Sequence, residues 1–191
     1  MGSLDMRATL ASRPDQPTLD AVLSELKASA DPRNVEGMAR YGISAIGTMG
    51  VSMPIVRSMA KRLGKSHDLA LALWDSGVHE ARILAALVDE PAKFTLEQAE
   101  RWVMDIDSWD VCDQLCGNLL GRTSFAYELV PEWVKREEEF VRRAGFVLMT
   151  QLAVHDKKAS NEHFLEFLPL IENAATDNRN FVKKAVNWAL R

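Results

Sequence analysis

Apolar residues occur along the chain in segments of helical length, and residues that commonly begin or end helices bound these segments. Serine, threonine or aspartate precedes most of the segments, and glycine follows several of them. No segment alternates between apolar and polar residues between pairs of turn residues, so we expect no β-sheet. The expected helices run from Asp31–Pro32 to Gly42, from Ser52 to Gly64, from Ser66 to Gly77 and from Ser108 to Gly121, and two more begin at Ser124 and Ser160.

Two local motifs add detail to these boundaries. The run from Thr95 to Gln98 has the form of a capping box, which predicts the start of another helix. Pro131 lies inside the helix that begins at Ser124. It should kink or break that helix, because proline has no amide hydrogen and its ring clashes with the preceding turn.

Four of the apolar segments can be aligned with one another as an internal repeat. The steps between their starting points are 31, 31 and 41 residues, a spacing typical of stacked helical hairpins. Each hairpin in such an array buries its apolar face against the next one, and the second helices line the concave side. The aligned segments are VHEARILAAL from Val78, WDVCDQLCGN from Trp109, FVRRAGFVLM from Phe140 and FVKKAVNWAL from Phe181.

The alignment places four charged residues at similar positions in their segments. Arg82 and Asp113 fall at the fifth position, and Arg143 and Lys184 fall at the fourth. All four should therefore project near the mouth of the concave surface. The alternative is that each belongs to the solvated polar face of an amphipathic helix, which is the usual role of a single charge.

Length and composition are those of a globular protein. The 191 residues are 47% hydrophobic and 26% charged, which excludes a disordered or fibrous chain, and no apolar run is long enough to span a membrane. Residues 1–16 lack a long apolar stretch, so we expect a flexible leader rather than a signal peptide, followed by one domain over residues 17–191. The net charge of −4 does not decide whether nucleic acid binds, because the segment 51–65 carries four bases and no acid.

The cysteines and histidines give no indication of a metal site. Cys112 and Cys116 are four residues apart, which places two small, half-buried thiols on one face of a helix rather than in a disulfide. The four histidines are scattered, and zinc would need more ligands at tighter spacing. We therefore expect no metal and no other cofactor.

The candidate chemistry is carried by Trp109, Asp113, Arg143 and Trp188. Trp109 and Asp113 are four residues apart and share one helix face, with Ser108 as the expected cap. An indole offers a π-face to a cation or a sugar edge, and a carboxylate in a low dielectric stabilises a developing cation. Arg143 offers a planar fork for a phosphate, and Trp188 lies on another basic helix.

Structural roles remain open for two of these residues. Trp109 alone would be explained by core packing, and Asp113 by an ion pair with Arg143 or Arg82, which is compatible with a catalytic role. Core packing is also the expected role of Trp74, Trp102, Trp133 and Met149, and His79-Glu80 is expected to form hydrogen bonds between helices.

At these residues the sequence resembles the bacterial DNA alkylation repair enzymes, a family of DNA glycosylases built from HEAT-like repeats. The resemblance covers residues 30 to 191, and its most specific parts are the W-D-x-x-D run at Trp109 and the K-A-x-x-W-x-L-R run that ends at Arg191. Four stretches carry it: Gly50–Val88, Ser108–Cys116, Phe140–Lys157 and Phe181–Arg191.

The resemblance implies an all-α fold, a right-handed α-solenoid of HEAT-like helical hairpin repeats with a concave surface that faces DNA. It implies a monofunctional glycosylase that hydrolyses the N-glycosidic bond of cationic N3- and N7-alkylated purines in double-stranded DNA. It also implies capture of the damaged duplex along the concave surface without a dedicated base pocket, of which the sequence shows no sign. We expect a monomer in the bacterial cytoplasm, associated with the nucleoid and with no membrane partner.

The family's catalytic positions fall on Trp109, Asp113 and Trp188. Asp113 would stabilise the sugar cation and orient the attacking water, while the two indoles would pack on the sugar and backbone at the lesion. The expected DNA-binding residues are Arg143, Arg142, Lys183, Lys184, Arg82 and Lys157, although Lys157 could equally be a solvated loop residue.

The sequence departs from the family at three points. Phe140 stands where many relatives have tryptophan, and Gly145 follows in the same segment. The chain also stops at Arg191, where relatives usually continue into further helices, so we expect a C-terminally truncated array whose last helix is exposed on one side. An alternative function is therefore a non-catalytic HEAT-repeat protein that binds DNA structures or a protein partner.

Overall fold

The computed structural model describes residues 17–191, and the expected leader over residues 1–16 lies outside this part of the chain. Helices account for all the regular structure of the described residues, and none of these helices is long and apolar enough to cross a bilayer. The helices are α1 (Leu19–Ala28), α2 (Pro32–Arg40), α3 (Met53–Leu63), α4 (His67–Asp75), α5 (His79–Val88), α6 (Leu96–Met104), α7 (Trp109–Asn118), the 3-10 helix η1 (Leu120–Arg122), α8 (Ala126–Trp133), α9 (Glu139–His155), α10 (Asn161–Leu165), α11 (Leu168–Asn173) and α12 (Asn180–Leu190).

The helix starts confirm several of the expected caps. The side chains of Asp31, Ser66 and Thr95 accept hydrogen bonds from backbone amides in the first turns of α2, α4 and α6. Ser52 and Ser108 also stand directly before α3 and α7, but neither hydroxyl accepts a hydrogen bond from its own helix. These two residues mark helix starts without capping them through the side chain.

Three of the expected boundaries are wrong. The helix after Ser108 ends at Asn118 and gives way to η1, so it does not continue to Gly121. Helix α8 starts at Ala126 and passes through Pro131 before it ends at Trp133. The single helix expected after Ser160 is divided into α10 and α11, because Pro169 lacks the amide that would bond to the carbonyl of the preceding turn.

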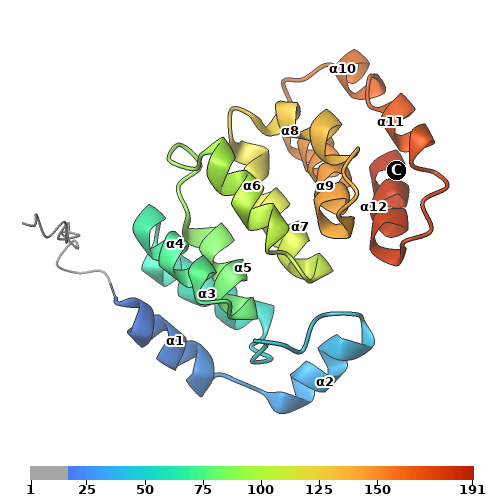
Figure 1. Ribbon diagram of the computed structural model, residues 1–191. Coiled ribbons are helices and arrows are strands. Elements are labelled where there is room, and N and C mark those ends of the chain that lie inside the picture. Colours follow the sequence, from blue (N-terminus) through green and yellow to red (C-terminus); the bar gives the residue numbers. More distant parts are fainter. Residues whose placement is uncertain (1–16) are drawn as a thin grey trace, which may run out of the picture.

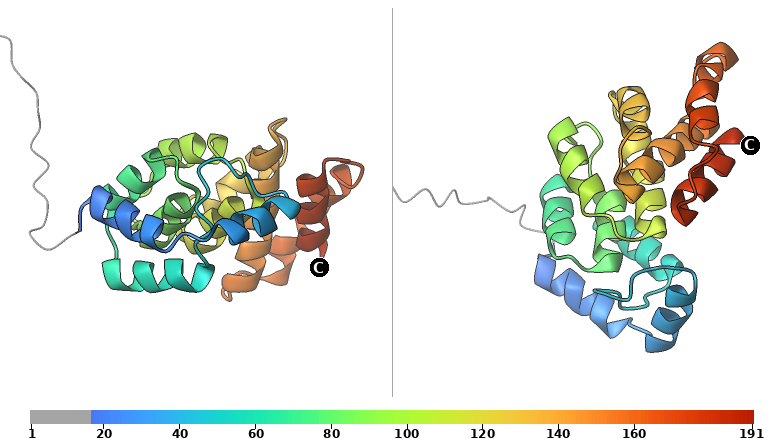
Figure 2. Two further views of the ribbon diagram at one scale, coloured as in Figure 1. Left: turned by 90° about the horizontal axis from the view of Figure 1, so that it is seen from below. Right: turned by 45° about the vertical axis from the view of Figure 1, so that its right-hand side comes forward.

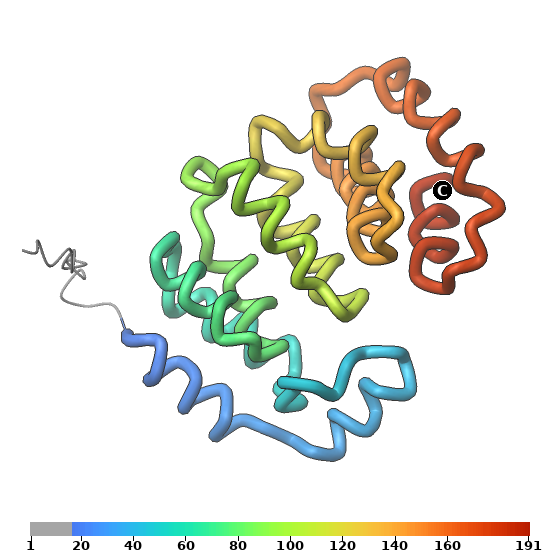
Figure 3. The backbone as a smooth tube through the Cα atoms, in the orientation of Figure 1, coloured from blue at the N-terminus to red at the C-terminus, as the bar shows by residue number. Residues whose placement is uncertain are grey.

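The second helices of the repeat pack on one another in chain order. Helix α5 contacts α7, α7 contacts α9, and α9 contacts α12, while α3 and α4 pack on α5 and α8 packs on α9. These four helices begin within one residue of the four aligned segments, which confirms the repeat. In Figure 1 the hairpins follow one another from α4 and α5 on the left to α10, α11 and α12 on the right. Figure 3 shows the same path of the backbone as a tube.

The core contains the tryptophans that the sequence assigned to packing. Trp74, Trp102 and Trp133 are buried, and the rings of Trp74 and Trp102 stack with their centroids 4.1 Å apart. Met149 is buried as expected. The indole nitrogen of Trp74 donates a hydrogen bond to the carboxylate of Asp105 at 2.9 Å, so this buried polar atom has a partner.

The cysteines and Gly145 are set by close packing between helices. Cys112 and Cys116 are free thiols and fully buried, not half-buried as expected, and burial raises the pKa of the Cys116 thiol well above its usual value. A β-carbon on Gly145 would lie 2.8 Å from both the side chain and the backbone nitrogen of Val134. Glycine at this position therefore allows α9 to approach the end of α8 closely.

Candidate functional site

The three candidate catalytic residues line one cavity. Trp109 and Asp113 come from the first turns of α7, and Trp188 comes from the end of α12. Arg143 of α9 belongs to the same lining. The cavity has a volume of about 300 Å³, and its remaining lining residues are Tyr41, Phe181 and Lys184. The structure therefore brings together the four residues that the sequence singled out for chemistry.

Asp113 and Arg143 form a buried ion pair. A guanidinium nitrogen of Arg143 donates to Oδ1 of Asp113 at 2.7 Å, and the two side chains are only 5% and 18% exposed, respectively. Of the two alternatives for the partner of Asp113, the structure has Arg143 rather than Arg82. Burial raises the pKa of Asp113, and the charge and hydrogen bond of Arg143 oppose this rise only in part. Oδ2 of Asp113 accepts no hydrogen bond from residues 17–191, and it is the oxygen left for other partners.

Arg143 also fixes the helix that carries Trp188. Its other terminal nitrogen donates to the carbonyl of Phe181 at 2.8 Å, at the start of α12. The ring of Phe181 stacks on Phe140 with the centroids 5.5 Å apart, so Phe140 of α9 packs against α12. Trp188 is 38% exposed, which leaves its indole accessible at the edge of the cavity.

A segment that the sequence did not assign to the site crosses the helix starts. Residues 41–51, which follow α2, run past the first residues of α5, α7 and α12 (Figure 2). The indole of Trp109 donates to the carbonyl of Tyr41 at 3.1 Å, and the hydroxyl of Ser108 accepts from the amide of Ser44 at 3.0 Å. A β-carbon on Gly42 would lie 2.7 Å from the ring of Phe181, so the segment also touches α12.

Glu80 anchors this segment to α5. Its buried carboxylate accepts hydrogen bonds from the amides of Met49, Gly50 and Val51 at 2.7 to 3.1 Å. Gly50 has a φ of +76°, and a β-carbon there would lie 2.2 Å from the carbonyl oxygen of Asp31. Only glycine fits this turn, which brings three successive amides onto one carboxylate.

His79, the neighbour of Glu80, joins α5 to α7. Its Nε2 lies 2.9 Å from the carboxylate of Asp110, so the expectation of an inter-helix hydrogen bond is confirmed. Burial lowers the pKa of His79, but the hydrogen bond and charge of Asp110 outweigh it and leave the pKa raised above 6.5. Although the imidazole is only 2% exposed, its carboxylate partner Asp110 favours the charged form.

A second, larger cavity lies on the other side of Trp109 and Asp113. Its volume is about 550 Å³, and it is enclosed between α2 with the following segment on one side and α5 with α7 on the other. The two linings share Tyr41, Trp109 and Asp113. This cavity could not be predicted from the sequence, because its walls come from segments that are distant along the chain.

Two of the expected DNA-binding arginines are engaged elsewhere. Arg82 donates to the carbonyl of Asp105 at 2.7 Å, and its guanidinium lies 5.5 Å from the centre of the Trp74 ring. Arg142 pairs with Asp177 at 3.5 Å, and its side chain is 20% exposed. Neither arginine lines the two cavities that meet at Asp113.

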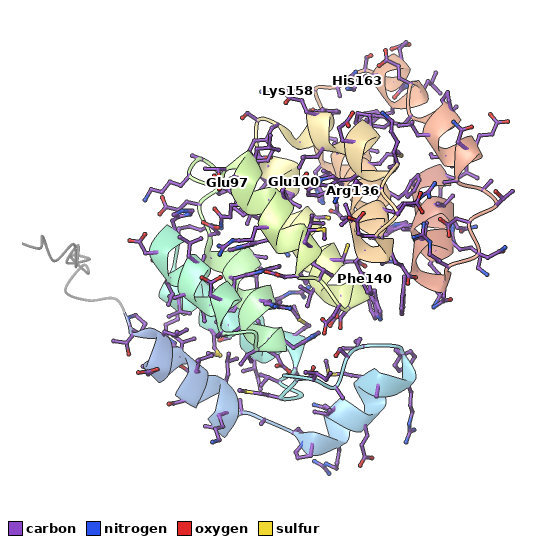
Figure 4. The ribbon with its side chains drawn as sticks, in the orientation of Figure 1. Glu97, Glu100, Arg136, Phe140, Lys158 and His163 are labelled. Atoms are coloured by element: carbon purple, nitrogen blue, oxygen red, sulfur yellow. The ribbon has the colours of Figure 1, made fainter. Side chains whose placement is uncertain are left out.

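The three expected DNA-binding lysines lie in different places. Lys184 is exposed and lines the 300 Å³ cavity. Its neighbour Lys183 is also exposed but lines another cavity, between α11 and α12. Lys157 is exposed in the turn that follows α9, next to Lys158. Figure 4 shows Lys158 and Phe140 at opposite ends of this helix, so Lys157 lies far from the start of α9 where the site is built.

Comparison with known proteins identifies the family and the fold. A family model described as DNA alkylation repair enzyme matches residues 22–191. The chain is 22% identical over 138 residues to the uncharacterized protein Lin0241 of Listeria innocua, and 21% identical over 138 residues to the uncharacterized protein Lmo0209 of Listeria monocytogenes. Each match covers 70% of this chain, which spans only 62% of the length of these relatives.

A solved structure has the same fold. It is described as a new family of proteins related to the HEAT-like repeat DNA glycosylases with affinity for branched DNA structures. The TM-score is 0.82 at 19% sequence identity, and the comparison covers 91% of this chain and 74% of the other. The expected HEAT-like repeat fold is thereby confirmed. Because the family model matches nearly all of the described residues, the chain belongs to the DNA alkylation repair enzyme family.

Proposed function

We propose that this protein binds double-stranded DNA and hydrolyses the N-glycosidic bond of cationic N3- and N7-alkylated purines. One observation carries the proposal: Trp109, Asp113 and Trp188, drawn from two helices, line a single cavity in which Asp113 is held by Arg143. A carboxylate between indoles is suited to a cation that develops on a sugar, because it attracts positive charge where little water competes.

The reaction needs little from the protein beyond this carboxylate. The bond between C1′ and the purine nitrogen breaks, and its electron pair neutralises the positive charge of the alkylated base. The sugar becomes an oxocarbenium-like cation, and a water molecule then forms the new bond to C1′ and gives up a proton. A cationic base leaves without being protonated, so no acid partner is required.

Each side chain of the site has a different role in this scheme. Oδ2 of Asp113 would face the sugar cation and orient the water, while Oδ1 is held by Arg143. Arg143 is a positioning residue in this scheme, because both of its terminal nitrogens bind protein oxygens. Trp109 and Trp188 would pack on the sugar and backbone, and the exposed Lys184 is better placed than Arg143 to contact a phosphate.

A second candidate function is binding of DNA structures without base removal. The segment 41–51 across the helix starts favours it, because this segment narrows the approach to Asp113. Affinity for branched DNA structures is stated of the solved relative, and here it would be a property of the same helical array.

Release of free base from methylated duplex DNA separates the two functions. We expect the wild type to release 7-methylguanine or 3-methyladenine, and we expect Asp113→Asn to lose at least about 100-fold of this rate while it still binds the duplex. Asp107→Asn is the matched control, because it removes an exposed carboxylate that precedes the same helix. The proposal fails if the wild type binds DNA but releases no base, or if Asp113→Asn and the wild type release it equally.

A further inference from the structure

Building on the proposed function, we propose that helix α3 binds duplex DNA through Arg57 and Lys61, on the side of Asp113 opposite to Lys184. Helix α3 lies outside the four aligned helices of the repeat, and none of the residues so far assigned to DNA belongs to it. With α3 included, phosphate contacts hold the duplex on both sides of the lesion and fix its register on the protein.

Helix α3 belongs to the same row as the second helices of the hairpins. It packs against α5, as α5 packs against α7, α7 against α9, and α9 against α12. Within residues 17–191 the row therefore runs from α3 to α12, with α7 and its Asp113 in the middle (Figure 1). Packed helices lie about 8 to 10 Å apart, so the four steps of this row cover roughly 30 to 40 Å, about one turn of duplex DNA.

Carboxylates occur in this row only near the helix starts. Helices α3 and α12 contain no acidic residue, and the other three contain none beyond their first five residues. Only four of the 27 acidic residues of the chain lie in the row: Glu80, Asp110, Asp113 and Glu139. A protein with a net charge of −4 thus has one layer of helices that a polyanion can approach with little repulsion.

The register of α3 turns two of its bases toward the site. Met53, the first residue of α3, lines the 550 Å³ cavity, whose lining also includes Asp113. Arg57 and Lys61 follow Met53 at intervals of four residues, so the three side chains lie on one side of the helix. This stripe of residues starts beside the site and leads away from it along α3.

Arg57 and Lys61 are free to bind a ligand. Both are exposed, and neither forms an ion pair or a side-chain hydrogen bond with residues 17–191. Arg62, on another side of the same helix, instead pairs with Glu25 of α1 at 2.5 Å. Four residues of helix place Arg57 and Lys61 about 6 Å apart along the axis, which suits phosphates one or two nucleotides apart on one strand.

The two cavities place these bases and Lys184 on opposite sides of the carboxylate. Lys184 lines the 300 Å³ cavity, Met53 lines the 550 Å³ cavity, and Asp113 lines both. A duplex that lies across the row therefore meets bases at α3 and at α12, with its lesion over α7. The acidic residues of the helix starts lie between these two basic regions and face the cationic base rather than the phosphates.

The salt dependence of duplex binding tests the role of α3. On a duplex of roughly 20 base pairs, we expect Arg57→Ala and Lys61→Ala each to weaken binding several-fold and to lower the slope of log affinity against log salt by about 1. The double variant should lower the slope by about 2. Thermal unfolding of each variant checks that the fold is kept.

Arg62→Ala is the matched control, because it removes a base from the same helix on the side that faces Glu25. We expect its affinity for the duplex to stay within about twofold of the wild type, since an exposed ion pair contributes little. If Arg57→Ala and Lys61→Ala bind the duplex as Arg62→Ala does, α3 does not bind DNA and the proposal is wrong.

Shortened duplexes test the placement on opposite sides of Asp113. The probe is a duplex with a stable abasic analogue, placed in the middle or about two base pairs from either end. We expect one shortened duplex to lose the penalty of the Arg57→Ala and Lys61→Ala double variant, and the other to lose the penalty of Lys184→Ala. If one shortening removes both penalties, or neither shortening removes any, the two basic regions do not hold opposite sides of the lesion.

Base release by the wild type separates this inference from the proposed function. If the wild type binds duplex DNA through Arg57 and Lys61 but releases no alkylated base, the α3 surface stands and the glycosylase proposal fails. If the wild type releases base while the double variant binds duplex DNA as tightly as the wild type, the glycosylase proposal stands and the α3 surface is refuted.

Discussion

Two arginine–carboxylate clusters involve helix α9 or the turn before it, and they differ in burial. Arg143 pairs with Asp113 of α7 at 2.7 Å, with side chains that are 5% and 18% exposed. Arg136 pairs with Glu100 of α6 at 3.3 Å and with Glu138 at 2.7 Å, and all three side chains are about 40% exposed. Figure 4 shows Arg136 and Glu100 close together, and neither residue lines the two cavities that meet at Asp113.

The same two chemical groups behave differently in the two places. The hydrogen bond from Arg136 lowers the pKa of Glu138 to about 2, so this exposed carboxyl group loses its proton more readily than an ordinary glutamate does. Burial raises the pKa of Asp113 although Arg143 is as close to it. The exposed cluster therefore serves as an ordinary surface contact, whereas the buried pair keeps a carboxylate in an environment where its charge acts strongly on a nearby cation.

Breaking the buried pair should have the largest effect on stability. Arg143→Met leaves Asp113 buried without its partner and removes the hydrogen bond to the carbonyl of Phe181. We expect a loss of about 3 kcal/mol in the free energy of unfolding, measured by urea denaturation near neutral pH. If Arg143→Met lowers the free energy of unfolding no more than Arg136→Ala does, the ion pair does not stabilise the buried charge of Asp113.

The pH dependence of base release should follow Asp113. Release needs the ionised carboxylate, and a pKa raised above 3.8 means that protonation begins at a higher pH than in an ordinary aspartate. The rate should therefore fall by about tenfold per pH unit on the acid side of this raised pKa. In Arg143→Gln, which removes the charge that lowers the pKa, the fall should begin at still higher pH. A profile that is flat down to the ordinary aspartate range contradicts this account.

The adjacent lysines of α12 extend the comparison to DNA binding. Lys184 lines the cavity beside the buried pair, whereas Lys183 lines the cavity between α11 and α12. We expect Lys184→Ala to weaken binding of duplex DNA several-fold and to reduce the slope of log affinity against log salt by about 1. Lys183→Ala is its control, and an equal effect of the two variants would show that the cavity does not set where the phosphates lie.

Breaking the exposed cluster should have the smallest effect. Arg136→Ala removes partly screened contacts, and we expect its effect on unfolding to be several-fold smaller than that of Arg143→Met. Because Arg136 lies away from both cavities, base release by this variant should equal that of the wild type. A large loss of release would show that the exposed cluster is coupled to the site.

Much of the fold could be predicted because the relevant signals are local. Caps such as Asp31 and Thr95 bond within the first turn of their own helices, so the sequence reveals them directly. Trp109 and Asp113 share a helix face through their spacing alone, and the repeat register predicted that α9 would lie next to α7 and α12 next to α9.

The position of the segment 41–51 and the larger cavity could not be predicted, because both depend on contacts between residues that are distant along the chain. The carbonyl of Tyr41 accepts a hydrogen bond from the indole of Trp109, which is 68 residues away along the chain. Nothing in the local sequence pattern links these two residues. Glu80 looks like any acidic residue in the first turn of a helix, although it binds three amides of another segment. The hydroxyl of Ser108 serves the amide of Ser44 instead of its own helix, a choice that only packing can decide.

A single-turnover assay tests the central claim most directly. Protein in excess over methylated duplex DNA is incubated, and free alkylated base and the matching apurinic sites are counted over time for the wild type and for Asp113→Asn. We predict that the wild type yields equal amounts of free base and apurinic sites and that Asp113→Asn binds the duplex but yields neither above the spontaneous rate. Binding by the wild type without release of base, or equal release by the two proteins, would contradict the account.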